Sequence, residues 1–64
     1  MVAQIADFET GDRIYDANID CTPNIGDILW VDIGKGKRMN VKVMQVCHWI
    51  GERAHKLCVY VGQI

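Results

Sequence analysis

The chain has 64 residues, of which 50% are apolar and 23% are charged, and its formal net charge is −1. This length allows one domain, residues 1–64, with a small core, and the composition is that of a globular protein and not of a disordered one. The near-neutral charge argues against a general nucleic-acid binder, because such domains usually carry a clear basic excess.

Targeting and redox features are sparse. After Met1 the sequence has no basic stretch followed by an apolar run, and no segment approaches the ~20 apolar residues that cross a bilayer. We therefore expect neither a secretory signal nor a membrane span, and a cytoplasmic location. Three cysteines, Cys21, Cys47 and Cys58, are too few and too irregularly spaced for a disulfide framework, so we expect them to be reduced.

Charge is distributed unevenly along the chain. Residues 1–27 hold six of the eight acidic residues against a single cation, Arg13, whereas residues 28–64 hold six of the seven basic ones. The two parts therefore carry net charges of −5 and +4. In so small a protein, this asymmetry predicts neighbouring strands whose opposite charges complement one another.

The first third of the chain predicts a β-hairpin over residues 2–20, turning at Thr10-Gly11-Asp12. The apolar spacing of residues 2–9 would also suit a short helix, and the sequence leaves that alternative open. Residues 21–26 contain Pro23 and Gly26, which predict a corner before the next strand.

The remaining chain predicts a strand over residues 27–33 and a long hairpin over residues 38–62. A glycine-rich turn at 34–37 separates the two, and the hairpin breaks at residues 51–54. Its first strand, residues 38–50, is far longer than a typical strand of five or six residues. We expect it to bend across a barrel or to project as a ribbon.

Strict alternation assigns the side chains of the long hairpin to two faces. The face expected to be core collects Met44, Val46, His48, Ile50, His55, Leu57, Val59 and Val61. The opposite face mixes large rings with polar groups and collects Val43, Gln45, Cys47, Trp49, Ala54, Lys56, Cys58 and Tyr60. On this second face we predict a surface for a partner or a second subunit, formed by Trp49, Tyr60, Gln45 and Lys56.

About five antiparallel strands with apolar residues on both faces must curl. The sequence thus predicts an all-β fold, a small five-stranded antiparallel barrel of SH3-like or OB-like type. The stretch from Cys21 to Val31, followed by residues 41–46 and 59–61, resembles small uncharacterised proteins of phages and prophages. The resemblance implies a viral origin and carries no functional residue with it.

Four residues that can bind zinc lie near the tip of the long hairpin, namely Cys47, His48, His55 and Cys58, and together they suggest a zinc site. Alternation groups Cys47 with Cys58 and His48 with His55 on opposite faces, so we expect no metal site. A four-residue loop would place Cys47 opposite Cys58, close enough for a disulfide under oxidation. The chain has no serine, and neither histidine is tied to an orienting carboxylate near a cysteine, so we expect no catalytic residue and no cofactor.

These observations favour a non-enzymatic interaction module that binds a protein partner and forms a homo-oligomer. A phage-encoded accessory or inhibitor protein would be of this kind. The alternative is a nucleic-acid or nucleotide binder that uses the basic hairpin tip at residues 34–38 with an aromatic ring. Its phosphate and base contacts would come from Lys35, Lys37, Arg38, Lys42 and Trp30.

Overall fold

A computed structural model describes residues 2–64, apart from the side chain of residue 33. The five strands are β1 (Val2–Asp7), β2 (Arg13–Asn18), β3 (Ile28–Gly34), β4 (Lys37–Ile50) and β5 (His55–Gln63). Residues 2–64 contain no helix, and hence none long and apolar enough to span a membrane. The prediction of an all-β fold with five strands is confirmed, and the helical alternative for residues 2–9 is wrong.

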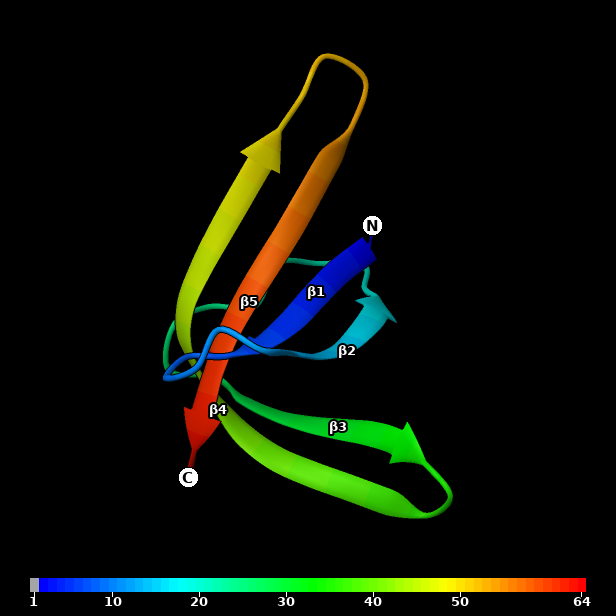
Figure 1. The fold of residues 1–64 in the computed structure, drawn as a ribbon, viewed down its shortest axis with the longest axis vertical. Helices are drawn as coiled ribbons and strands as arrows, with labels where there is room; N and C mark the ends of the chain where they lie inside the picture. Colours follow the sequence, from blue (N-terminus) through cyan, green and yellow to red (C-terminus); the bar gives the residue numbers. More distant parts are fainter. Residues whose placement is uncertain (1) are drawn as a thin grey trace.

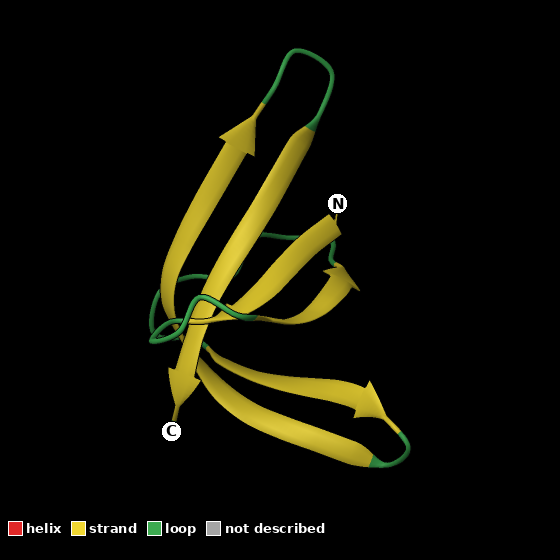
Figure 2. Cartoon of the chain, viewed as in Figure 1, coloured by secondary structure: helices red, strands yellow, loops and turns green. Residues whose placement is uncertain are grey.

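The strands form one sheet in the order β2-β1-β5-β4-β3, which curls into a half-barrel (Figures 1 and 2). Neighbouring strands run antiparallel except β1 and β5, which pair in parallel from Ala3 opposite Leu57 to Asp7 opposite Val61. The prediction of a purely antiparallel sheet is therefore wrong. Tight turns impose antiparallel pairing on adjacent hairpin strands, but β1 and β5 come from opposite ends of the chain and no turn sets their direction.

The acidic part of the chain supplies β1 and β2, and of these β1 alone adjoins a strand from the basic part, β5. The acidic side chains make local contacts instead. The Asp7 carboxylate accepts the backbone N–H groups of Glu9 and Thr10 at 2.8 and 3.3 Å, and Asp16 forms an ion pair with Arg13 at 3.4 Å. The prediction that the two charged parts complement one another across neighbouring strands is wrong for β2, which lies at the sheet edge.

The core fills the concave side of the sheet. It consists of Ala3, Ile5, Val31, Val41, Val43, Leu57, Val59 and Val61. A β-bulge in β4 places Val43 opposite Val61 but Gln45 opposite Tyr60, so the alternation of faces shifts by one residue. Val43 is consequently 0% exposed and Met44 is 42% exposed, so the predicted faces of these two residues are wrong. The bulge also bends the strand.

The tip of the β4–β5 hairpin projects beyond the body of the half-barrel (Figure 1). Its four-residue loop is closed by the Gly51 N–H, which donates to the Ala54 carbonyl at 2.8 Å. Leu57 lies where β1 begins to cover β5 and is 1% exposed, whereas Ile50, nearer the tip, is 76% exposed. The loop length confirms the prediction that Cys47 lies opposite Cys58.

Candidate functional site

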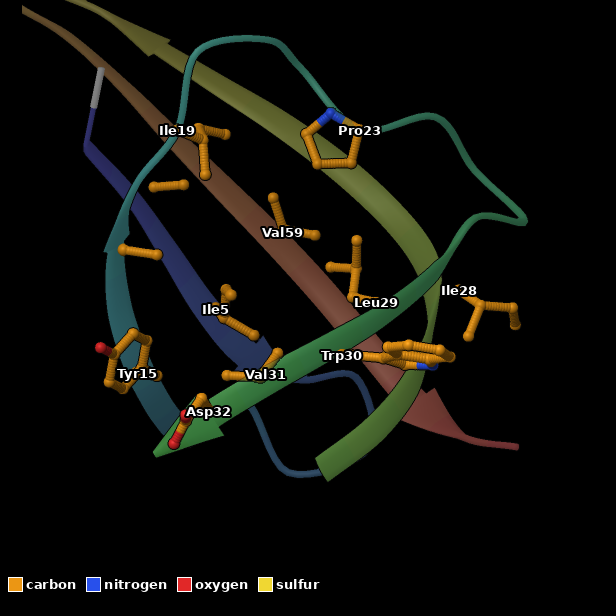
Figure 3. A pocket seen from close by; sticks show the side chains of 12 residues that line it. Ile5, Tyr15, Ile19, Pro23, Ile28, Leu29, Trp30, Val31, Asp32 and Val59 are labelled. Carbon is orange, nitrogen blue, oxygen red and sulfur yellow. The ribbon is translucent and has the colours of Figure 1, made fainter. Parts of the chain in front are cut away.

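The half-barrel is open between its two edge strands. β2 and β3 lie at opposite ends of the strand order, and no ladder joins them within residues 2–64. The connection over residues 19–27 runs from β2 to β3 across one end of this opening (Figure 3). An uncovered strand edge presents unpaired backbone groups that can pair with another chain.

The hydrogen bonds between β3 and β4 determine which backbone groups of β3 are unpaired. The Val43 N–H donates to the carbonyl of Asp27 at 2.8 Å, so this carbonyl points toward β4 and the N–H of the next residue, Ile28, points away from it. In an antiparallel strand the backbone groups of successive residues point to alternate sides. The N–H and C=O groups of Ile28, Trp30 and Asp32 therefore point away from β4, into the opening.

A pocket of about 290 Å³ lies beside this edge (Figure 3). Its floor and walls are mainly apolar and come from four strands and from the connection that crosses the opening. The lining residues are Ala3, Ile5, Tyr15, Ala17, Ile19, Pro23, Ile28, Leu29, Trp30, Val31, Asp32 and Val59. Because residues from both faces of β3 line it, the pocket extends around the free edge of that strand.

Acidic residues occur on or beside both strands that border the opening. Asp12, Asp16 and Asp20 lie on or beside β2 and are exposed, and Asp32 lines the pocket from β3. Asp16 is the member of this group with a cation beside it, Arg13 at 3.4 Å. The pocket thus combines mainly apolar walls with the carboxylate of Asp32, and further acidic residues lie along β2, an arrangement complementary to an apolar segment that carries basic residues.

The predicted partner surface on the outer face of β4–β5 forms a continuous row. Gln45 lies opposite Tyr60, Cys47 opposite Cys58 and Trp49 opposite Lys56. The Lys56 ammonium lies 5.9 Å from the centre of the Trp49 ring, which is 61% exposed. A shallow groove of about 600 Å³ continues from this row across the outer sides of neighbouring strands, lined by Val2, Gln4, Arg13, Asp16, Trp49, Lys56, Leu57 and Cys58.

Within this row, the side chains of Cys58 and Tyr60 interact. The side-chain hydrogen bond with Cys58, together with the charge of the Cys58 thiolate, raises the pKa of Tyr60 above its ordinary value of 10.0. On the other strand, the Gln45 amide donates to the Cys47 sulfur at 3.3 Å. Both cysteines are half-buried, and neither forms a disulfide bond.

We predict that Cys47 and Cys58 form an intrachain disulfide when the protein is treated with oxidised glutathione. They occupy a hydrogen-bonded cross-strand pair, where Cα atoms lie about 5.5 Å apart, a separation typical of disulfides. The two thiols lose their hydrogens as one glutathione disulfide is reduced to two glutathione molecules. The closed loop is short, so the expected stabilisation is about 2–3 kcal/mol.

Intact mass and thiol titration measure this reaction directly. The expected product is a monomer that has lost two hydrogens and keeps Cys21 as its free thiol. The Cys58→Ala variant should form no intrachain bond under the same conditions. Recovery of only Cys21-linked dimers from the unsubstituted protein would show that the cross-strand pair does not have the required geometry.

The basic tip between β3 and β4 is a two-residue turn. Lys35 and Gly36 have φ values of 55° and 73°, and the flanking Gly34 pairs with Lys37, which is the pattern of a type I′ hairpin. Lys37 alternates with Arg38 along β4, so their side chains leave on opposite faces. The predicted phosphate contacts are therefore not all on one surface.

Three of those predicted contacts do come together on the outer face of β3–β4. Trp30 lies opposite Asn40, and Arg38 and Lys42 are two residues to either side of Asn40 on the same face. The Arg38 guanidinium carbon lies 6.0 Å from the centre of the Trp30 ring, and the ring is 71% exposed. This cluster is an exposed aromatic ring flanked by cations.

The turn itself gives a stability prediction. At Gly36 no described heavy atom lies within 4 Å of an added Cβ, so Gly36→Ala tests the positive φ alone and should destabilise by about 1–2 kcal/mol. Lys35→Asn places a residue that tolerates this conformation and should stabilise by up to about 1 kcal/mol. Urea unfolding of the two variants measures both, and equal stabilities would contradict the turn assignment.

The soft ligands of the hairpin tip lie as predicted. Cys47 and Cys58 share the outer face, and His48 and His55 share the other, with Nδ1 of His48 2.8 Å from Nε2 of His55. In the part of the chain that the structure describes, no three side chains of His, Cys, Asp or Glu gather closely enough to hold a metal ion.

The pocket between β2 and β3 is the feature that the sequence did not reveal. A partial signal exists in Ile28 and Trp30, large apolar residues on the face of β3 opposite Leu29 and Val31.

Comparisons of the chain with protein-family models, with curated proteins and with solved structures gave no match.

Proposed function

We propose that this protein is a non-enzymatic interaction module that binds an extended segment of a protein partner in the cytoplasm. The segment adds to the free edge of β3 and fills the opening between β2 and β3. The observation that carries the proposal is the free β3 edge lying directly beside an open apolar pocket. As part of the same proposal, the fold is a barrel of SH3-like or OB-like type, and the protein acts as an accessory or inhibitor protein of a phage.

Strand addition explains how a small surface could bind with useful affinity. Backbone hydrogen bonds to Ile28, Trp30 and Asp32 would fix the register of the partner strand, and its alternate side chains would provide specificity. Side chains on one side of that strand would enter the pocket, where Ile5 and Val59 lie (Figure 3). Side chains on the other side would lie beside the exposed Trp30 ring.

The charge at the rim indicates the composition of the partner segment. Asp32 lines the pocket, and Asp12, Asp16 and Asp20 lie on or beside β2, the strand across the opening from β3. We therefore propose a segment that alternates apolar residues with lysine or arginine. Complementary charge mainly increases the association rate and the specificity, while the apolar side chains supply the affinity.

Selection of binding peptides from a displayed random library, with the purified protein as the target, tests this function. We expect the selected peptides to alternate apolar and basic residues and to bind Ile28→Pro about tenfold more weakly, because proline removes one edge N–H. Proline is tolerated at the first residue of an edge strand, so this variant should fold. The matched control is Trp49→Ala, on the outer face of the far hairpin, which should bind normally.

Three results would overturn the proposal. These are a selection with no enrichment, peptides that bind Ile28→Pro as well as the unsubstituted protein, and peptides lost only on Trp49→Ala. The third result would instead place the partner on the row of Trp49, Tyr60, Gln45 and Lys56. A second copy of the chain is a partner of the same chemical kind, and light scattering with and without Ile28→Pro detects a homo-oligomer formed through this edge.

Single-stranded nucleic acid is a second candidate ligand, favoured by the Trp30 ring with Arg38 and Lys42 on the same face. Bases stack on exposed aromatic rings while cations bind the phosphates. If oligothymidylate binds there, it should quench tryptophan fluorescence, and the logarithm of its affinity should fall with the logarithm of salt with a slope of about −1.4 for two cations. Unchanged binding by the Arg38→Ala, Lys42→Ala double variant would exclude this surface.

A further inference from the structure

His48 and His55 form a close pair on the projecting hairpin, on the face that continues the core side of the sheet. Nδ1 of His48 lies 2.8 Å from Nε2 of His55, and the two rings stack with centroids 5.0 Å apart and planes inclined by 22°. Both side chains are exposed. Neither ring is needed by the opening between β2 and β3 or by the Trp30 cluster.

The hairpin register holds these rings together. His48 lies opposite Leu57 and His55 opposite Ile50, so the histidines are diagonal neighbours on successive cross-strand pairs of the same face. The Gly51–Ala54 hydrogen bond places both pairs at non-hydrogen-bonded positions, where side chains of the two strands come closest. The backbone therefore brings the two imidazoles together before any ligand is present.

We propose that His48 and His55 bind one divalent late transition-metal ion as a two-nitrogen chelate, with water completing the coordination. With metal–nitrogen bonds of about 2.0–2.1 Å, a 2.8 Å separation of the nitrogens corresponds to an angle at the metal of about 86°. Tetrahedral coordination would need the nitrogens about 3.3 Å apart. The pair fits neighbouring positions of a square-planar or octahedral ion, which Ni²⁺ and Cu²⁺ prefer and Zn²⁺ does not.

Binding requires a change of tautomer and a rotation of the two rings that turns both facing lone pairs toward one ion. In the metal-free protein one of the two facing nitrogens donates a hydrogen bond to the other. That ring moves its proton to its other nitrogen, so both facing lone pairs are available to the ion and both rings stay neutral. Since both rings are exposed, the fold hinders neither their rotation nor this proton exchange nor the bound water.

The ion would join the two strands near the tip, where little else supports the hairpin. In the unfolded chain the histidines are not held together, so the metal binds the folded state more tightly and stabilises it. The half-buried thiols of Cys47 and Cys58 are also soft ligands, but they lie on the opposite face. Variants of each pair therefore separate the two possible sites.

Isothermal titration of the full chain with Ni²⁺ tests the proposal, because Ni²⁺ does not oxidise the thiols as Cu²⁺ can. We expect one ion per chain, and binding about tenfold weaker or worse in His48→Asn and in His55→Asn, because each loses the second, intramolecular ligand. The Cys47→Ala, Cys58→Ala double variant should bind as the unsubstituted protein does. Ni²⁺ should raise the Tm of the protein but not that of either histidine variant.

Folding of the variants is verified by their Tm in EDTA, which should match that of the unsubstituted protein because both histidines are exposed. Should one variant fail to fold, the other tests the pair alone. Ni²⁺ binding that survives both histidine substitutions, or that disappears with the cysteines, would overturn the site. Absence of Ni²⁺ binding at millimolar concentration would overturn it as well, and tighter binding of Zn²⁺ than of Ni²⁺ would overturn the cis geometry.

Discussion

Val43→Asp should unfold the protein, whereas Met44→Asp should leave it folded. Val43 is 0% exposed and packs in the core opposite Val61, so an aspartate there would be a buried carboxylate without a partner. This cost exceeds the roughly 5 kcal/mol of stability expected for a small domain. Met44 is 42% exposed on the outer side of the bulge, and its substitution should cost about 1 kcal/mol or less.

Circular dichroism and urea unfolding of the two variants measure this difference. The comparison is internally matched, because the same side chain is introduced at adjacent positions of one strand. Strict alternation through β4 places Met44 in the core and Val43 outside, so it predicts the reverse order. A folded Val43→Asp beside an unfolded Met44→Asp would therefore show that β4 has no bulge at this position.

Leu57→Ala should be the most damaging of the conservative core truncations, with an expected loss of about 2–5 kcal/mol. The Leu57 side chain is 1% exposed and is among the largest fully buried side chains of the described residues. Ile50 lies on the same face of the hairpin but is 76% exposed, so Ile50→Ala should change the free energy of unfolding by less than about 0.5 kcal/mol.

The midpoints of urea unfolding give both values. This pair of variants locates the end of the folded body along the hairpin, between Leu57 and the tip. A large loss of stability in Ile50→Ala would mean that the tip packs against something, whether its own body or a second copy. A small loss in Leu57→Ala would mean that β1 does not cover β5 at Ala3.

Much of the strand pattern could be predicted because it depends on local chemistry. Glycine and proline lie at the turns, and valine-rich segments such as residues 41–46 lie between them, so the strands occur where the sequence predicts them. The parallel pairing of β1 with β5 joins the two ends of the chain, and no local turn encodes it. The bulge beside Met44 adds one residue without altering the hydrophobic composition, so the alternation of the sequence conceals it.

In the candidate sites too, features set by local sequence could be predicted and features set by the whole sheet could not. It was predictable that Cys47 lies opposite Cys58 and that His48 and His55 share the other face, because the loop length fixes every pair between the loop and the bulge. The pocket was not, because it exists only where a curled sheet stops short of closing. Closure depends on the twist and tilt of all five strands together, which no single segment determines.

Amide hydrogen exchange along β3 most directly tests the claim that this strand is a free edge. The N–H groups of Ile28, Trp30 and Asp32 should exchange rapidly, while those of Leu29 and Val31, which point toward β4, should be protected. This alternation would vanish if the edge were covered. Protection of Ile28, Trp30 and Asp32 equal to that of their neighbours, in the isolated protein, would contradict the open half-barrel and the binding mode built on it.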